Sequence, residues 1–227
     1  MTEIGMKKVV IILSILSFFV EKDTLQKVTI NGYEIVFPYT PVTEEEITMI
    51  APVIKKWTDF YNIDFAQARV VKVDTGCFNC PDDPRNFFTK DDKDDTDKRI
   101  GVDYSPNKQR YVTLFTLDYR NGKYYAEWDD SQNVWLFDRK QKHANMILEL
   151  GACALAEAVF WVSNDIFIVV GYHRYDAPIF KHFVKVYNIV NQTQSYYEII
   201  SEIKEDTDFS GYMQEVYYKE KGISVIN

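Results

Sequence analysis

The segments "NVWLFDRKQKHANMILEL" (Asn133–Leu150) and "FVKVYNIVNQTQSYYEII" (Phe183–Ile200) follow one pattern. Each has an alternating apolar run, then an Asp or Asn, a polar turn and a second run, which indicates two strands joined by a turn. Before them lies another matching pair, "DYSPNKQRYVTLF" (Asp103–Phe115) and "FWVSNDIFIVVGY" (Phe160–Tyr172), each with two strand-like runs around a Ser-containing turn. The sequence therefore predicts two similar four-stranded antiparallel meanders.

The composition agrees with a mainly β protein. Aromatic residues make up 15% of the 227 residues, and together with the many Val and Ile residues they favour strands over helices. The hydrophobic share of 46% and the charged share of 26% are those of an ordinary folded protein. The net charge of -8 argues against nucleic acid as a partner, because binding to phosphates needs a basic surface.

Residues 100–200 resemble the β-propeller blades of bacterial exported proteins, in which a stretch such as "VWLFD" (Val134–Asp138) before a polar turn commonly closes a blade. The resemblance implies blade-like antiparallel sheets. Because a propeller ring typically needs about four to eight blades, two copies alone cannot close one. We therefore expect either two sheets packed face to face, as in a sandwich, or further strands supplied by the N-terminal part of the chain.

Two hairpins are predicted from Asn-Gly pairs, which suit the positive φ angles of a tight two-residue turn. One is "KVTINGYEIVF" (Lys27–Phe37), with its turn at Asn31-Gly32. The other is "TLFTLDYRNGKYYAEW" (Thr113–Trp128), with its turn at Asn121-Gly122. A further strand is predicted at Ala68–Val73.

One amphipathic helix is predicted over Thr43–Tyr61. Thr43 and Glu46 have the spacing of a capping box, in which each residue's side chain accepts a hydrogen bond from the other's backbone. Pro52 lies inside the pattern and is expected to kink or shorten the helix. The apolar face that we expect to pack on the core consists of Ile47, Ile50, Ile54, Trp57 and Tyr61.

The N-terminal stretch "MKKVVIILSILSFFVEKD" (Met6–Asp23) has the layout of an export signal, with two lysines before a short apolar run. The run, Val9–Val20, would span about 18 Å as a helix, which is too short for the hydrocarbon layer of a membrane. It also resembles the leader of a bacterial lipoprotein, although no Cys follows it to carry the lipid. The alternative is a hydrophobic first strand. We expect an exported protein of the periplasm or cell surface of a bacterium.

The chain is accordingly divided into three parts. Residues 1–20 form the export signal-like segment, and residues 21–99 hold the first hairpin, the helix and an acidic loop with two cysteines. Residues 100–227 hold the duplicated meanders. A single compact domain over residues 21–227 is the alternative division.

The stretch "DTGCFNCPDDP" (Asp74–Pro84) holds two closely spaced cysteines among acidic residues. Acidic neighbours raise the pKa of a thiol and oppose redox catalysis, and the prolines that follow make a poor start for the helix that a thioredoxin-like site needs. A zinc site needs further ligands, and Cys153 lies in an Ala-rich run that is predicted to be buried. We expect a disulfide between Cys77 and Cys80, or two free thiols.

A calcium site is the other metal hypothesis for this region. Asp92, Asp94 and Asp103 are placed as in an EF-hand loop, but Asp97 stands where that loop needs Gly, and a terminal Glu is missing. A solvated acidic loop is the simpler interpretation. We therefore expect no cofactor, with calcium and zinc as the alternatives.

Aromatic residues near turns are the candidate binding residues, because exposed rings offer contact area to sugars or to protein surfaces. The alternative is that these rings only cover the face of a sheet. The candidates are Tyr119, Tyr124, Tyr125, Tyr172, Tyr175 and Phe180.

No catalytic set can be assembled from the motifs, since a nucleophile elbow and a Gly-rich phosphate loop are both missing from the sequence. We expect a binding or protein-interaction module of the cell envelope, with a protein or carbohydrate partner and with contact to the membrane only through the N-terminal segment. The alternatives are a hydrolase or metal-dependent protein, with a site near residues 77–97, and a purely structural subunit.

Overall fold

The chain divides into two units, Met1–Tyr39 and Thr40–Asn227. The computed structural model describes residues 24–30, 33–75, 102–114, 117–120, 123–126, 131–174, 179–202, 211–223 and 225–226. In the first unit, β1 (Thr24–Ile30) pairs antiparallel with β2 (Tyr33–Pro41), and Ile30 lies opposite Tyr33. The first predicted hairpin is therefore confirmed.

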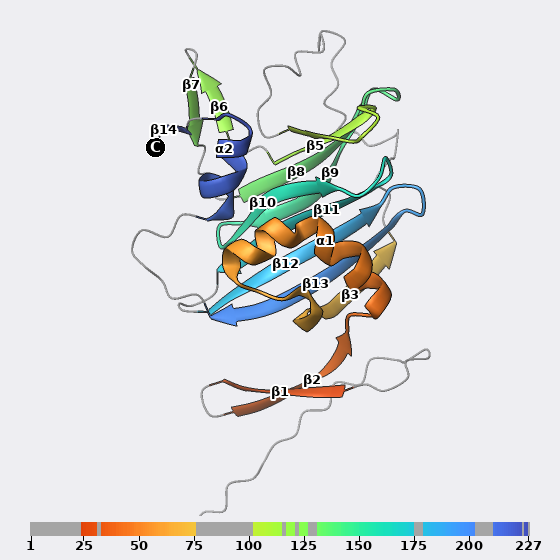
Figure 1. Ribbon diagram of the computed structural model, residues 1–227, viewed down its shortest axis with the longest axis vertical. Helices are drawn as coiled ribbons and strands as arrows, with labels where there is room; N and C mark the ends of the chain where they lie inside the picture. Colours follow the sequence, from red (N-terminus) through yellow and green to blue (C-terminus); the bar gives the residue numbers. More distant parts are fainter. Residues whose placement is uncertain are drawn as a thin grey trace, which may run out of the picture. The chain divides into compact units, whose positions relative to one another are not determined.

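An antiparallel sheet, which we call the first sheet, occupies much of the second unit (Figure 1). Within the second unit its strands run in the order β3-β13-β12-β11-β10, and the end of β2 pairs with β3 on the side away from β13. Their bounds are β3 (Arg69–Thr75), β10 (Ala154–Trp161), β11 (Ile166–Arg174), β12 (Ile179–Asn188) and β13 (Thr193–Glu202). Strands β10 to β13 are neighbours both in sequence and in the sheet, so the later meander is confirmed, and the predicted strand at residues 68–73 becomes β3.

The second sheet has the order β4-β5-β8-β9 and forms the earlier meander, which is also confirmed. Its bounds are β4 (Val102–Tyr104), β5 (Arg110–Thr113), β8 (Ser131–Asp138) and β9 (His143–Gly151). Between β5 and β8 the chain forms the hairpin β6 (Leu117–Arg120) and β7 (Lys123–Ala126), as predicted, and β14 (Val225–Ile226) pairs in parallel with β7. The protein is thus mainly β. A propeller-like or sandwich-like arrangement of the two meanders stays a prediction.

The two meanders share the chemistry of one turn. In the β8–β9 turn, the Asp138 carboxylate accepts hydrogen bonds from two backbone N–H groups of its own turn, at 3.0 and 2.9 Å. In the β12–β13 turn, the Asn188 side chain accepts one such bond at 3.0 Å. Lys142 and Gln192, each just before the next strand, both have φ of 54°. The Asp or Asn of the sequence pattern therefore ends the first strand by satisfying the backbone of the turn.

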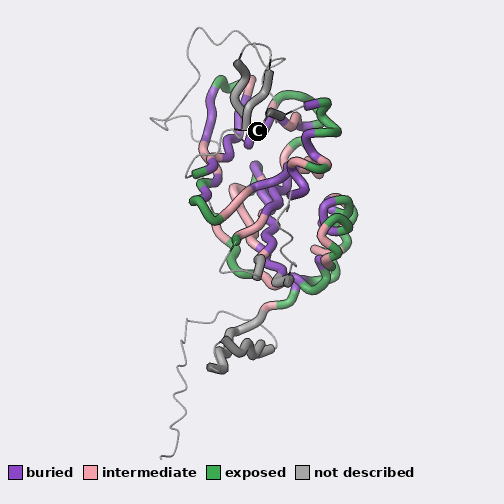
Figure 2. Tube along the Cα trace, turned by 90° about the vertical axis from the view of Figure 1, so that its left-hand side faces the viewer, coloured by how far each residue is buried: buried purple, intermediate pink, exposed green. Residues whose placement is uncertain are grey.

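Helix α1 (Glu44–Tyr61) lies across the first sheet (Figure 1). The capping box is confirmed: Glu46 accepts the Thr43 N–H at 2.8 Å, and Thr43 accepts the Glu46 N–H at 3.2 Å. The helix continues through Pro52, so the expected shortening does not occur. Figure 2 shows that one side of the helix is buried and the other exposed, as its apolar face predicts. A short 3₁₀ turn, η1 (Phe65–Gln67), connects α1 to β3.

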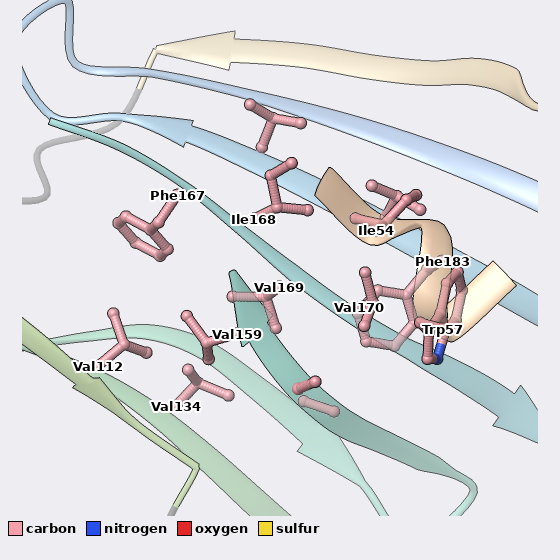
Figure 3. Packing of buried hydrophobic residues seen from close by; sticks show 14 of the residues in the cluster. Ile54, Trp57, Val112, Val134, Val159, Phe167, Ile168, Val169, Val170 and Phe183 are labelled. Atoms are coloured by element: carbon pink, nitrogen blue, oxygen red, sulfur yellow. The ribbon is translucent and has the colours of Figure 1, made fainter. Parts of the chain in front are cut away.

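The main core lies between α1 and the two sheets. Ile54 and Trp57 of α1 are fully buried against the first sheet, and Val134 of the second sheet belongs to the same cluster (Figure 3). A smaller cluster includes Tyr111 and Phe137, whose rings stack at 4.6 Å between centroids. Because neighbouring residues of β5 and β8 contribute to different clusters, the second sheet is buried on both faces.

The chain near the C-terminus forms a helical segment that the sequence did not predict: one π-helical turn, η3 (Met213–Tyr217), followed by α2 (Tyr218–Glu220). Glu220 forms an ion pair with Lys56 of α1. Among the described residues, no helix is long and apolar enough to cross a membrane. The export signal-like segment at residues 1–20 lies outside the described residues.

The prediction that Cys153 is buried is wrong. Cys153 is exposed in the tight turn that joins β9 to β10, and the Ala-rich run after it forms β10. The turn begins after Gly151, so the residues that directly follow it stay at the surface and burial starts further along the strand.

Candidate functional site

Within the second unit, β10 and β3 lie at the two sides of the first sheet, where backbone groups are left to satisfy. A strand at the side of a sheet presents a row of N–H and C=O groups that its own sheet cannot pair. Such an edge is either covered by the rest of the chain or open to another one. The two strands differ in this respect.

The edge of β10 is covered by a side chain of the second sheet. The Ala156 N–H donates to Gln132 Oε1 at 2.6 Å, and Gln132 Nε2 donates to the Ala156 carbonyl at 3.0 Å. Gln132 Nε2 also donates to the Leu114 carbonyl at 3.2 Å. The buried amide of Gln132 therefore acts as a paired strand would, and it satisfies both backbone groups of Ala156.

A β-bulge in β10 directs Glu157 into the protein. Ala156 lies opposite Gly171 and Ala158 opposite Val170, so Glu157 is the extra residue of the bulge. Regular alternation would place Ala156 and Ala158 on one face and Glu157 on the other, whereas the bulge places Ala156 and Ala158 on opposite faces, and all three residues are buried. Gly171 makes this possible, because a Cβ at that position would overlap the carbonyl oxygen of Leu155.

Glu157 is fully buried and receives hydrogen bonds from α1 and from the C-terminal segment. Trp57 Nε1 donates to Oε2 at 3.0 Å, and the Tyr61 hydroxyl donates to Oε1 at 2.7 Å. The Met213 N–H donates to Oε1 at 3.5 Å, and the Tyr212 N–H donates to the Tyr61 hydroxyl at 3.0 Å. We call these five residues the Glu157 cluster. It joins β10, α1 and the start of η3.

Burial dominates the electrostatics of the Glu157 cluster. Burial raises the pKa of Glu157 to about 7, while hydrogen bonds from Trp57 and Tyr61 act in the opposite direction. Burial also raises the pKa of Tyr61, and the charge of Glu157 raises it further. The pKa of Tyr172 and that of Tyr212 each rise to about 12 for the same two reasons. Glu157 therefore gains or loses a proton near neutral pH while these tyrosines stay neutral.

His182 lies beside the cluster, with its ring 4.4 Å from the ring of Tyr61 and 5.4 Å from that of Trp57. Burial lowers the pKa of His182 to about 4, so this ring is neutral at physiological pH. Glu157, Trp57 and His182 are all fully buried. The arrangement can hold one proton and can anchor the C-terminal segment, and none of these three side chains contacts solvent.

The edge of β3 is the opposite case. Only Val70 and Arg69 of β3 pair with the end of β2, through Thr40 and Pro41. Lys72–Thr75 pair with β13 on one side, and within the described residues of the second unit β3 has no strand partner beyond Val70 on the other. We call Val71–Thr75 the β3 edge.

Side chains of the β3 edge are exposed on both faces of the strand. Val71 is 46% exposed and Val73 is 63% exposed, which is unusual for β-branched apolar residues in a sheet. Lys72 and Asp74 share the other face and form an ion pair at 2.6 Å, and the Lys72 side chain is 66% exposed. Tyr196 lies opposite Lys72, and Tyr197 lies opposite Val70. Val71 is therefore the extra residue of a β-bulge.

The structure places the predicted aromatic residues in several environments. Tyr119 lies opposite Tyr124 and Tyr125 opposite Asp118 in the β6–β7 hairpin. Tyr172 lies within β11, away from a loop tip, and is only partly exposed. Phe180 is the second residue of β12, and Tyr175 lies outside the described residues. A carbohydrate site at these rings stays a prediction.

The predicted metal and disulfide residues are mostly beyond what the structure describes. Asp92, Asp94, Cys77 and Cys80 all lie outside the described residues. The described residues contain no group of three or more His, Cys, Asp or Glu that could hold a metal ion.

Asp103 is the one predicted metal ligand that the structure describes. It lies on β4, where its carboxylate pairs with Lys221 and accepts the Tyr217 hydroxyl. Its backbone carbonyl accepts the Trp161 indole N–H at 2.9 Å. In this structure Asp103 thus connects β4 to β10 and to the C-terminal segment.

Comparison of the chain with protein-family models, with curated proteins and with solved structures gives no match.

Proposed function

We propose that this chain is a protein-interaction module of the cell envelope that binds an extended segment of a partner as an additional strand at the β3 edge. The observation that carries the proposal is the open side of Val71–Thr75, where exposed side chains flank a backbone with no strand partner among the described residues. The export-like leader supports the location. A hydrolase or metal-dependent site near residues 77–97 stays a prediction, because that region lies outside the described residues.

Strand addition uses backbone hydrogen bonds for affinity and alternating side chains for specificity. The β3 edge supplies both. Val73 and Thr75 offer an apolar and β-branched face, whereas Lys72 and Asp74 offer one positive and one negative charge on the other face. An edge with an exposed lysine resists indiscriminate pairing, so a partner needs a matching charge pattern.

The rest of the first sheet is suited to hold this edge in place. Arg69, at the start of β3, forms an ion pair with Glu198 of β13. Glu198 also accepts the Tyr196 hydroxyl at 3.1 Å, and Tyr196 lies opposite Lys72. The edge is therefore attached to β13, which lies inside the sheet, and a partner meets a preformed backbone.

The proposal is tested by selecting binders from a displayed library of short peptides against the purified full chain. We expect selected peptides with alternating apolar and polar residues, whose binding is lost in Val73→Asp. Val190→Asp is the matched control, because Val190 is 69% exposed in the β12–β13 turn, away from the open side. Binding should also slow hydrogen exchange in β3. Failure to select any peptide, or binding that survives Val73→Asp, would contradict the proposal.

A further inference from the structure

We infer that the strand bound at the β3 edge is β3 of a second copy of this chain, paired antiparallel about a two-fold axis at Val73. This inference rests on the proposed function and names its partner. A two-fold interface brings the same surface of both copies together, so the surface must be complementary to itself. Among axes at the three central residues of the β3 edge, Lys72, Val73 and Asp74, the axis at Val73 meets this condition.

The register follows from charge. In an antiparallel pair, directly opposite residues lie on the same face of the sheet. A two-fold axis between two identical strands therefore places one residue directly opposite the same residue of the second copy. An axis at Lys72 places two lysines opposite each other, and an axis at Asp74 places two aspartates opposite each other. Like charges directly opposite are unfavourable. An axis at Val73 avoids both contacts.

With the axis at Val73, Lys72 of each copy lies opposite Asp74 of the other. Lys72 and Asp74 already lie 2.6 Å apart within one strand, so the two copies together form an alternating group of two positive and two negative side chains on one face. On the other face, Val73 lies against Val73 of the second copy. The exposed apolar side chain at the middle of the edge is thereby buried at the centre of the interface.

The length of the pairing limits its strength. Pairing with β2 ends at Val70, and the bulge at Val71 interrupts the regular strand there. The shared ladder therefore runs over Val71–Thr75 at most. An interface of this size is far below that of a stable dimer, so we expect a weak dimer that forms with increasing concentration.

Charge reversal tests the register. Lys72→Glu alone or Asp74→Lys alone places like charges opposite each other at two symmetric positions, and we expect each to weaken dimerisation about tenfold in analytical ultracentrifugation. The double variant Lys72→Glu/Asp74→Lys restores opposite charges and should dimerise like the wild type. The matched control exchanges the charges of Lys55 and Asp59, an exposed ion pair on α1. This exchange should leave dimerisation unchanged.

Disulfide formation tests the axis. In a background with Cys77, Cys80 and Cys153 changed to Ser, Val73→Cys should form an intermolecular disulfide on oxidation, because opposite Cα atoms in a sheet lie about 5 Å apart. Thr75→Cys is the control. It is exposed on the same strand, but in this register the two Thr75 residues lie about 13 Å apart along the strands, and it should stay reduced.

The outcomes separate this inference from the proposed function. A monomer at every concentration, with peptide binding at the β3 edge intact, overturns the second copy as partner and leaves the proposed function standing. A dimer that ignores the charge reversals, or that crosslinks through Thr75→Cys as readily as through Val73→Cys, overturns the register. A monomer that also binds no peptide overturns both.

Discussion

Within the second unit, strands β10 and β3 lie at the two sides of one sheet, and each has a bulge in its pairing with the neighbouring strand. In β10 the extra residue is Glu157, which points inward and binds α1 and the C-terminal segment. In β3 the extra residue is Val71, which remains exposed. The same irregularity thus accompanies a closed edge at one side of the sheet and an open edge at the other.

The difference separates residues that stabilise the fold from residues that are available for binding. At the closed edge, Gln132 accepts the Ala156 N–H, and the Trp57 indole donates to Glu157 at the bulge. These contacts are therefore part of the folded state. The open edge contributes exposed side chains that folding does not need. Substitutions at β10 should therefore change the free energy of unfolding, whereas substitutions at β3 should change association.

Among substitutions at the two edges, the largest effect is expected for Glu157→Ala. Removing this carboxyl group leaves the Trp57 N–H and the Tyr61 hydroxyl without their acceptor in the core, which should lower the free energy of unfolding by about 4 kcal/mol. Urea denaturation measures the change. Glu149→Ala on β9, where the side chain is exposed, is the control and should stay within about 0.5 kcal/mol of the wild type. Equal effects would contradict the role of the Glu157 cluster.

The next effect is a dependence on pH. Burial raises the pKa of Glu157 from 4.5 to about 7, so the folded state keeps this proton to a higher pH than the unfolded state does. The stability from this group is complete below the unfolded pKa of 4.5 and is lost as the pH rises through about 7. A shift of this size corresponds to about 3 kcal/mol.

Comparison with Glu157→Gln isolates this contribution, because Gln cannot ionise and all other groups titrate as before. The wild type should lose stability relative to this variant between mildly acidic and mildly alkaline pH. Parallel stability curves for the two proteins would show that Glu157 has the same pKa in the folded and unfolded states.

A smaller loss is expected for Gly171→Ala. A methyl group there would overlap the Leu155 carbonyl oxygen opposite the bulge, and the strands would have to separate. We expect a loss of about 2 kcal/mol in the free energy of unfolding. Gly151→Ala is the matched control, since a Cβ at Gly151 meets no atom within 4 Å. A neutral Gly171→Ala would mean that β10 and β11 do not approach this closely.

The smallest effect on stability is expected at the open edge. Val73→Asp should change the free energy of unfolding by no more than about 0.5 kcal/mol, because the side chain is exposed. The same substitution at Val170, which is fully buried in β11, should abolish stable folding because it buries a charge. A strongly destabilised Val73→Asp variant would mean that folding itself needs the β3 edge.

Much of the fold could be predicted because the relevant signals are local. The Asn121-Gly122 pair requires a tight turn, Thr43 and Glu46 satisfy each other within one helical turn, and Asp138 binds the backbone of its own turn. Each of these contacts joins residues that are close in sequence. The alternation on both sides of such turns then defines the two meanders.

The closed edge could not be predicted because its contacts are distant in sequence. In "ALAEAVFW" (Ala154–Trp161) regular alternation predicts that Ala156 and Ala158 share a face opposite to Glu157, and the bulge breaks this alternation. The Trp57 indole that binds Glu157 comes from a helix far earlier in the chain. A charged residue amid a strand of small apolar residues, with Gly171 on the strand after it, is the signal that could have indicated a buried site.

The strand at the open edge could be predicted from the sequence, but its unpaired side could not. The run at residues 68–73 indicates a strand, and its lysine indicates an outer position. One of its neighbours in the sheet is β13, more than a hundred residues later, so the sequence alone does not show which part of β3 remains unpaired. The exposure of Val73 follows from that arrangement.

Hydrogen exchange measured on the full chain across a range of protein concentrations distinguishes the closed edge from the open one. Amides in the β10 peptide should be strongly protected at every concentration, while those in the peptide containing Val71–Thr75 should gain protection as the concentration rises. Equal and concentration-independent protection of both strands would show that the β3 edge is already closed within a single chain.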